Sequence, residues 1–278
     1  MMSIDAWREA GTFIEIGGHR MFYRREGTGV PLVLVHGYPT SSWDWVHVWG
    51  DLTARYDVIA MDMLGFGESA KPRRHRYTIA EQANLHTALL AKLGVQRFHA
   101  IVHDYGVTVG QELLARDAPI DSIAFLNGGL FPETHRARLI QRVLASPAGP
   151  LLARLTNERA FARSLAAVFA RKPSSEQMHA FWVLASKNDG MRALAGLIGY
   201  MAERREHRER WVDALVQATL PLVVINGSLD PVSGAHMIER LLELRPATNV
   251  VRLADVGHYP QIEAPREVLA AYAAFRGA

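Results

Sequence analysis

Apolar residues along the chain fall into short runs, separated by longer segments of mixed polarity. Residues 12–16 and 19–24 are β-type stretches, and Gly17-Gly18 joins them with the two-residue turn of a hairpin. The later runs are mostly apolar throughout, which is typical of strands buried on both faces of a sheet. These runs cover residues 32–35, 57–61, 98–102, 122–126, 221–225 and 249–253.

Helical segments separate these runs. We predict helices over residues 79–93, 107–115 and 236–244, and from Pro265 onward. Strands that alternate with helices indicate βαβ units. The predicted fold class is therefore α/β, with a mostly parallel sheet that starts with an antiparallel hairpin.

One long segment lacks the strand pattern and has helical character only, interrupted by proline and glycine residues. It extends over residues 130–216. We therefore expect an α/β core formed by residues 1–129 and 217–278, with residues 130–216 inserted before the last strands as a helical cap.

Composition limits the classes of partner. The net charge is only +3, and the densest charge run, residues 203–210, mixes both signs, so we expect a solvated helix face and no nucleic-acid partner. Cysteine is absent, which excludes thiolate chemistry. No apolar run has membrane-spanning or signal-peptide character. We expect a cytoplasmic protein without a membrane partner, and a homodimer stays open.

Polar residues follow four predicted strands, at the sheet edge where ligands bind in parallel sheets. They lie in residues 36–39, 103–106, 228–231 and 256–259. The strand-to-helix junction at 103–106 has the setting of a nucleophile elbow, which exposes one side chain, here Asp104. A Gly-x-Ser-x-Gly motif is absent from the sequence, so a serine mechanism lacks its signature.

Asp104, Asp230 and His258 follow the chain order nucleophile, acid, base, each after its own strand. Asp104 alone could be only a helix cap, but the order of the three residues favours a catalytic triad. A carboxylate can attack sp³ carbon, as in epoxides or alkyl halides. His258, oriented by Asp230, would then activate water to hydrolyse the alkyl ester, and the N–H groups of Tyr38 and Tyr105 would form the oxyanion hole.

These motifs resemble the epoxide hydrolase and haloalkane dehalogenase branch of the α/β-hydrolases. The resemblance rests on His36-Gly37-Tyr38-Pro39, residues 62–69, His103-Asp104-Tyr105-Gly106 and Gly257-His258-Tyr259-Pro260. Within that branch the chain is similar to the mesoderm-specific transcript protein group, including residues 127–136 and 188–190. The resemblance implies the α/β-hydrolase fold and an Asp-His-Asp triad. Vertebrate members of the group carry an apolar N-terminal segment that is missing here, so we do not expect their membrane association.

The resemblance also bears on the substrate. Haloalkane dehalogenases bind the halide with a Trp after the nucleophile and a second Trp or Asn, and Tyr105 and Tyr38 stand there in this chain. An aromatic residue at the Tyr38 position is what epoxide hydrolases show. Those enzymes usually present two cap tyrosines to the epoxide oxygen, whereas Tyr200 is the single tyrosine of residues 130–216. Tyr200 is either this proton donor or a core residue.

The remaining candidates are less specific. Trp43, Phe131 and Trp182 are expected either to wall a substrate pocket or to pack in the core, and His36 either to contact substrate or to brace the backbone. Histidine spacings typical of metal sites are absent, so we expect no metal and no cofactor. The expected partners are a small hydrophobic substrate and water. Haloalkane dehalogenase, ester hydrolase and non-catalytic ligand-binding protein remain as alternatives to an epoxide hydrolase.

Overall fold

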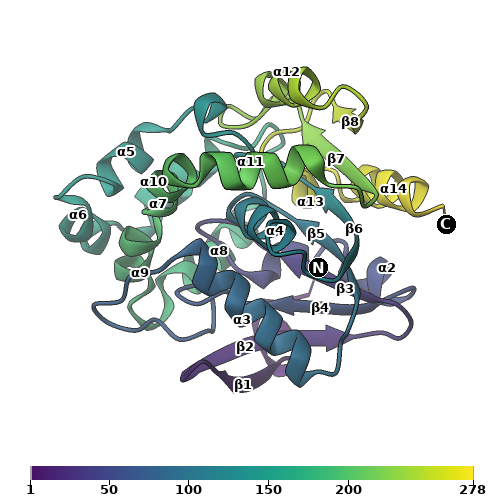
Figure 1. Ribbon diagram of the computed structural model, residues 1–278. Helices are drawn as coiled ribbons and strands as arrows, with labels where there is room; N and C mark the ends of the chain where they lie inside the picture. The colour runs from purple at the N-terminus through teal and green to yellow at the C-terminus, as the bar shows by residue number, and fades with distance from the viewer. Residues whose placement is uncertain (1, 278) are drawn as a thin grey trace.

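The computed structural model describes residues 2–277, and Met1 and Ala278, the outer ends of the predicted core ranges, lie outside the described residues. Its centre is an 8-stranded sheet in the order β1-β2-β4-β3-β5-β6-β7-β8 (Figure 1). The strands are β1 (Thr12–Ile16), β2 (His19–Glu26), β3 (Pro31–Val35), β4 (Asp57–Met61), β5 (Phe98–Val102), β6 (Ile120–Phe125), β7 (Leu222–Gly227) and β8 (Asn249–Leu253).

Strand direction follows the sequence prediction. β1 and β2 form the antiparallel hairpin, and β2 also pairs antiparallel with β4. All later pairings are parallel. Each side chain of β4, β5 and β7 is buried, as expected for strands covered on both faces. β6 begins two residues before the predicted run, because Ile120 pairs with Phe98.

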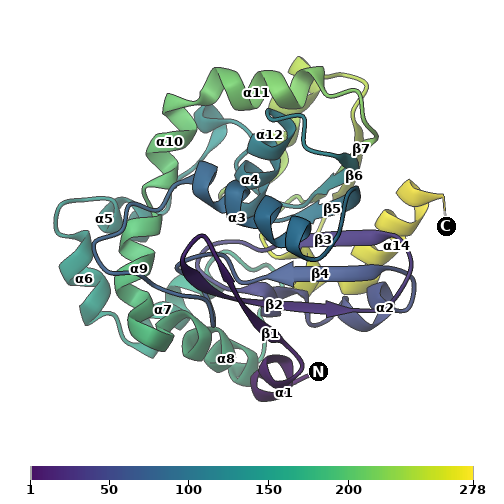
Figure 2. The same ribbon diagram turned by 60° about the horizontal axis from the view of Figure 1, so that its bottom comes forward.

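Helices cover both faces of the sheet, with α3 and α4 on one face and α2 and α14 on the other (Figure 2). The helices outside the long insertion are α1 (Ile4–Glu9), η1 (Ser42–Trp45), α2 (Trp49–Thr53), α3 (Ile79–Lys92), α4 (Tyr105–Leu114), α12 (Ala235–Leu244), α13 (Pro260–Glu263) and α14 (Pro265–Arg276). The short elements α1, η1, α2 and α13 have no counterpart in the sequence prediction, because each spans less than two turns of apolar periodicity.

Every element between β6 and β7 is a helix. The helices are η2 (Pro132–Thr134), α5 (Leu139–Leu144), α6 (Gly149–Leu155), α7 (Glu158–Ala166), α8 (Ser175–Ser186), η3 (Lys187–Asp189), α9 (Gly190–Leu197), α10 (Tyr200–Glu206) and α11 (Arg208–Gln217). Residues of α5 and α7 share a cavity with Asp104, which follows β5, so these helices lie over the carboxyl edge of the sheet. Within residues 2–277, each helix is too short or too polar to cross a bilayer.

Candidate active site

Asp104 lies in a sharp turn between β5 and α4. Its backbone has φ 49° and ψ −107°, a conformation that is strained for a residue with a side chain. Asp104 occupies the N-cap position of α4, yet its side chain makes no cap hydrogen bond, so capping does not explain this carboxylate. Gly106 lets the turn pack tightly, because a Cβ at this position would lie 2.5 Å from the carbonyl oxygen of Val35.

The three predicted triad residues lie together. The Nδ1 atom of His258 lies 2.7 Å from Oδ2 of Asp230, and its Nε2 atom lies 3.2 Å from Oδ2 of Asp104. Asp230 also accepts hydrogen bonds from Ser233 Oγ at 2.7 Å and from the Val232 N–H at 2.7 Å. The imidazole is therefore fixed between two buried carboxylates.

The charges of His258, Asp230 and Asp104 shift one another's pKa values. Burial by itself would lower the pKa of His258, but the adjacent Asp230 and Asp104 carboxylates outweigh it and raise that pKa to about 10. Burial would likewise raise the pKa of Asp230, whereas the His258 charge and hydrogen bond, together with Ser233, lower it to about 2. The pKa of Asp104 is also lowered, against its burial, by His258. The resting site therefore holds an imidazolium between two carboxylates.

The other carboxylate oxygen of Asp104 is hydrogen-bonded to one of the two backbone N–H groups predicted to form an oxyanion hole. Its Oδ1 atom accepts a hydrogen bond from the Tyr38 N–H at 2.8 Å. The N–H of Tyr105, at the first position of α4, makes no hydrogen bond to any acceptor within residues 2–277. One predicted donor is thus engaged with the carboxylate, and the second is available beside it.

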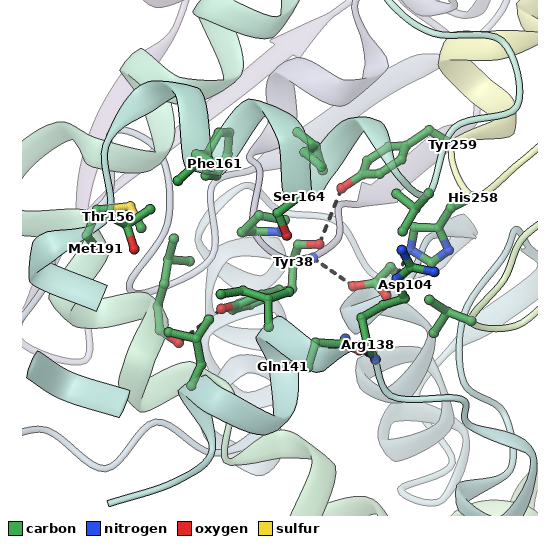
Figure 3. Close-up of a pocket in the computed structure, with 18 residues that line it drawn as sticks. Tyr38, Asp104, Arg138, Gln141, Thr156, Phe161, Ser164, Met191, His258 and Tyr259 are labelled. Atoms are coloured by element: carbon green, nitrogen blue, oxygen red, sulfur yellow. Dashed lines mark hydrogen bonds and ion pairs between the residues drawn. The ribbon is translucent and has the colours of Figure 1, made fainter. Parts of the chain in front are cut away.

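A cavity of about 130 Å³ opens on Asp104 and His258. Figure 3 shows these two residues and Tyr259 at one end, with Thr156, Phe161 and Met191 at the other. Most of the lining is apolar: Pro39, Ile140, Leu144, Ala160, Phe161, Leu165, Val168, Met191, Leu194 and Val232. A buried carboxylate therefore faces a small, largely apolar space.

His36 does not line the cavity that opens on Asp104. His36 is fully buried, with its Nδ1 atom 2.9 Å from the carbonyl oxygen of Gly37 and its Nε2 atom accepting from the Met63 N–H at 3.0 Å. Both ring nitrogens are therefore used by backbone groups. His36 braces the turn that carries Tyr38, which is the alternative role considered for it.

Three aromatic residues expected either to wall a pocket or to pack in the core lie in the packing. Trp43 is buried against Phe181 at a ring distance of 5.4 Å, and Trp182 packs against Phe161 at 5.5 Å. Phe131 is fully buried before η2. None of the three lines the cavity. An aromatic side chain has the same sequence signature in a core and in a pocket wall.

Tyr200 is buried close to the site but does not line the cavity. Its ring lies 6.1 Å from that of Tyr38 and 5.1 Å from that of Tyr105. Its hydroxyl oxygen accepts a hydrogen bond from Nε2 of Gln141 at 3.4 Å, and Gln141 does line the cavity. One side chain therefore separates the phenol from the space in front of Asp104.

Arg204 contradicts the prediction of a solvated face for residues 203–210, because it is buried behind Asp104. Its guanidinium donates to Oγ1 of Thr108 at 2.6 Å and to the backbone oxygen of Asp104 at 3.1 Å, and it lies 4.5 Å from the centre of the Tyr200 ring. Alternating charge signs do not reveal that one arginine of the run points inward.

Sequence reasoning also missed the role of Asn127, which lies two residues after the end of β6. Its side-chain amide donates to Oδ2 of Asp230 at 3.0 Å, and its Oδ1 atom accepts from the Gly227 N–H at 2.6 Å. The sequence does carry a signal for it, because Asn127 is a polar residue at the carboxyl end of an apolar run, as Asp104 is.

Comparison with known proteins places this geometry among hydrolases. A family model described as alpha/beta hydrolase fold matches residues 30–265. The mesoderm-specific transcript homolog protein of Homo sapiens is 41% identical over 293 residues, which cover 98% of this chain and 88% of that protein.

Two solved structures share the fold. A loop variant of haloalkane dehalogenase DbeA from Bradyrhizobium elkanii has a TM-score of 0.82 at 22% identity, with 96% of each chain covered. Epoxide hydrolase CorEH has a TM-score of 0.80 at 22% identity, with 96% of this chain and 98% of that chain covered. Because dehalogenase and epoxide hydrolase resemble this chain equally, the fold does not select the substrate.

Proposed function

Because this chain belongs to the α/β-hydrolase fold family, we propose that it hydrolyses a hydrophobic epoxide through a covalent ester on Asp104. The observation that supports this most is that the two carboxylate oxygens of Asp104 have different partners. Oδ1 is bound by the Tyr38 N–H, and Oδ2 points to His258 at the apolar cavity. We assign residues 130–216 as the cap that closes over the substrate.

In the first step, Oδ2 of Asp104 attacks a carbon of the epoxide, and the carbon–oxygen bond of the ring breaks. The released oxygen takes a proton from a hydroxyl, for which Tyr200 is our candidate once the substrate displaces the Gln141 side chain that separates it from the cavity, and solvent restores that proton. Oδ1 becomes the carbonyl oxygen of the new ester while it stays at the Tyr38 N–H. The first step thus leaves an alkyl ester whose carbonyl is already placed between oxyanion donors.

The ester also changes His258. Esterification removes the charge of Asp104, one of the two carboxylates that hold the pKa of His258 at about 10. The imidazolium then loses its proton more readily and can act as a base. It takes a proton from water, and the hydroxide attacks Cγ of Asp104. When the tetrahedral oxyanion at Oδ1 collapses, the bond between Cγ and the ester oxygen breaks, and the product oxygen takes the proton from His258. The new carboxylic acid of Asp104 then passes its proton to His258, which restores the resting ion pair.

We prefer an epoxide to a haloalkane as substrate because the cavity offers few free hydrogen-bond donors that could bind a departing halide. The hydroxyl of Tyr38 already donates to the carbonyl oxygen of Leu194 at 3.4 Å, and that of Tyr259 donates to the carbonyl oxygen of Tyr38 at 3.3 Å. The Tyr105 ring is buried against Phe66 and Tyr200. An epoxide needs one proton donor rather than a pair of halide donors. Dehalogenation remains the second candidate.

Ester hydrolysis is less well supported, because a carboxylate that attacks an ester forms an anhydride rather than a stable alkyl ester. A non-catalytic binding role is disfavoured by the triad itself. An imidazolium held by two buried carboxylates is a costly arrangement for ligand binding alone.

Parallel turnover assays would separate these proposals. Purified protein is incubated with hydrophobic epoxides, bromoalkanes and p-nitrophenyl esters, with Asp104→Ala as the control. Diol formation from epoxides that is lost in the control supports the proposal. Halide release without diol formation selects dehalogenation, and unchanged substrates whose binding still raises the melting temperature select a binding protein.

A further inference from the structure

The helices over the active site carry a surface that the proposed chemistry does not use. Five of the eight exposed large hydrophobic side chains within residues 2–277 lie on α5 and α6. They are Leu139, Ile140, Leu151, Leu152 and Leu155. Leu139 is 78% exposed, Leu151 62% and Leu155 69%. Single exposed apolar residues are ordinary, but such a concentration marks a binding surface.

Arginines accompany these leucines. Arg136, Arg142 and Arg154 are exposed on or next to the same two helices, and none of them forms an ion pair within the described part of the chain. Exposed arginines without an ion pair also occur elsewhere among these residues, for example Arg55 and Arg266, so the distinctive feature here is their combination with exposed leucines. Residues 136–157 contain no acidic side chain. We call these leucines, Ile140 and three arginines the arginine–leucine face.

We propose that the arginine–leucine face docks on an anionic lipid bilayer, so that a membrane-dissolved substrate enters the cavity from below the headgroups. Protruding leucines beside unpaired arginines suit a bilayer, because the leucines enter the acyl boundary while the arginines meet lipid phosphates. We expected no membrane partner from the lack of a spanning apolar run. A surface that lies on a bilayer needs no such run.

The position of the face supports this orientation. α5 and α6 lie at the outer edge of the molecule in both views, away from the sheet (Figures 1 and 2). Ile140 is exposed on this face and also lines the cavity that holds Asp104. Arg138, at the start of α5, lines the same cavity. An apolar molecule that leaves the bilayer at α5 is therefore already at the cavity.

A neighbouring cavity matches a lipid headgroup. This cavity has a volume of about 580 Å³ and lies between α5–α6 and α9–α10. Arg142 and Arg205 line it together with His135, and its lining contains no acidic residue. Its other walls include Leu144, Pro150, Ile198 and Met201. Basic groups over apolar walls fit a phosphate with its attached chains.

A second copy of the chain is a poorer occupant. In a two-fold contact the same face meets itself. Arg142 and Arg154 of each copy would then approach like charges, and this face offers no acidic residue to compensate. An anionic bilayer satisfies both the apolar and the basic groups at once. Docking itself is independent of the proposed chemistry, whereas substrate entry from the bilayer rests on it.

Co-sedimentation with vesicles tests the docking without any substrate. The full chain is mixed with phosphatidylcholine vesicles, with or without phosphatidylglycerol. We expect binding to be at least about tenfold stronger with phosphatidylglycerol, and to weaken as salt is added. The variants Leu151→Ser/Leu155→Ser and Arg142→Glu/Arg154→Glu should each lose at least about tenfold in binding. Val30→Ser/Arg266→Glu, which changes an exposed valine and arginine outside the face, should bind like the wild type.

Two results would overturn the proposal. The first is vesicle binding that is absent in the wild type or unchanged in both face variants. The second is a wild-type dimer in light scattering that Leu151→Ser/Leu155→Ser makes monomeric while vesicles bind neither protein. Turnover of a water-dissolved substrate should be unchanged in the face variants. Loss of the proposed chemistry would therefore be seen separately from loss of docking.

Discussion

The Oδ2 atom of Asp104 lies 3.2 Å from the Nε2 atom of His258, and the other oxygen of the same carboxylate is held by a backbone N–H. This relationship assigns different work to the two oxygens. In the proposed mechanism, Oδ2 forms the bond to substrate, and Oδ1 carries the charge when water later attacks the ester. It also couples the charge of Asp104 to the basicity of His258.

The coupling predicts how His258 titrates. In the wild type the imidazole keeps its proton until the pH rises through about 10, because both carboxylates raise its pKa. Asp104→Asn keeps the shape of the side chain but removes one of the two charges, as the ester does. We expect the pKa of His258 to fall in this variant. The measurement is an NMR pH titration of the imidazole, with Asp104→Ala as a second variant. An unchanged pKa would show that Asp104 does not control the base.

Tyr200→Phe tests the proton donor. If the Tyr200 hydroxyl protonates the opening epoxide, the variant should lose at least about tenfold in kcat on epoxides. Haloalkane turnover, where it occurs, needs no such proton and should change little. Tyr272→Phe is a matched control, because Tyr272 is a buried tyrosine on α14 that packs beside Tyr56. Equal losses on both substrates would assign Tyr200 to packing alone.

Gly106→Ala tests the turn that presents Asp104. The new methyl group would lie 2.5 Å from the carbonyl oxygen of Val35 and 2.7 Å from that of His36, and neither backbone group can move cheaply. We expect a loss of more than about 2 kcal/mol in the free energy of unfolding. Gly110→Ala on the same helix meets only side-chain carbons at 3.2 Å or more. Its effect should stay within about 1 kcal/mol, since alanine also favours the helix. Chemical denaturation of both variants makes the comparison, and similar losses would refute this account of the turn.

The sequence predicted the sheet well because its strands are buried. Mostly apolar runs such as residues 98–102 coincide with β5, and the parallel order places the residues after β5, β7 and β8 at one edge. Asp104, Asp230 and His258 can therefore be grouped from the sequence alone. Asn127 has the same signal and can be found in the same way.

The lining of the cavity could not be predicted in this way. Trp43, Phe131 and Trp182 have the composition of pocket walls, but whether an aromatic ring faces a core or a cavity depends on helix packing. Arg204 is hidden for a related reason, because only tertiary contacts decide which charged residue of a helix points inward. The faces of short helices such as α5 and α6 are equally undetermined by periodicity.

The covalent ester on Asp104 is the central claim, and mass spectrometry of His258→Gln tests it most directly. Without its base this variant should form the ester but fail to hydrolyse it. After incubation with a hydrophobic epoxide, we expect the peptide that contains Asp104 to gain the mass of the epoxide. Asp104→Ala/His258→Gln is the control and should gain nothing. An unmodified Asp104 peptide under conditions where the wild type forms diol would contradict the account.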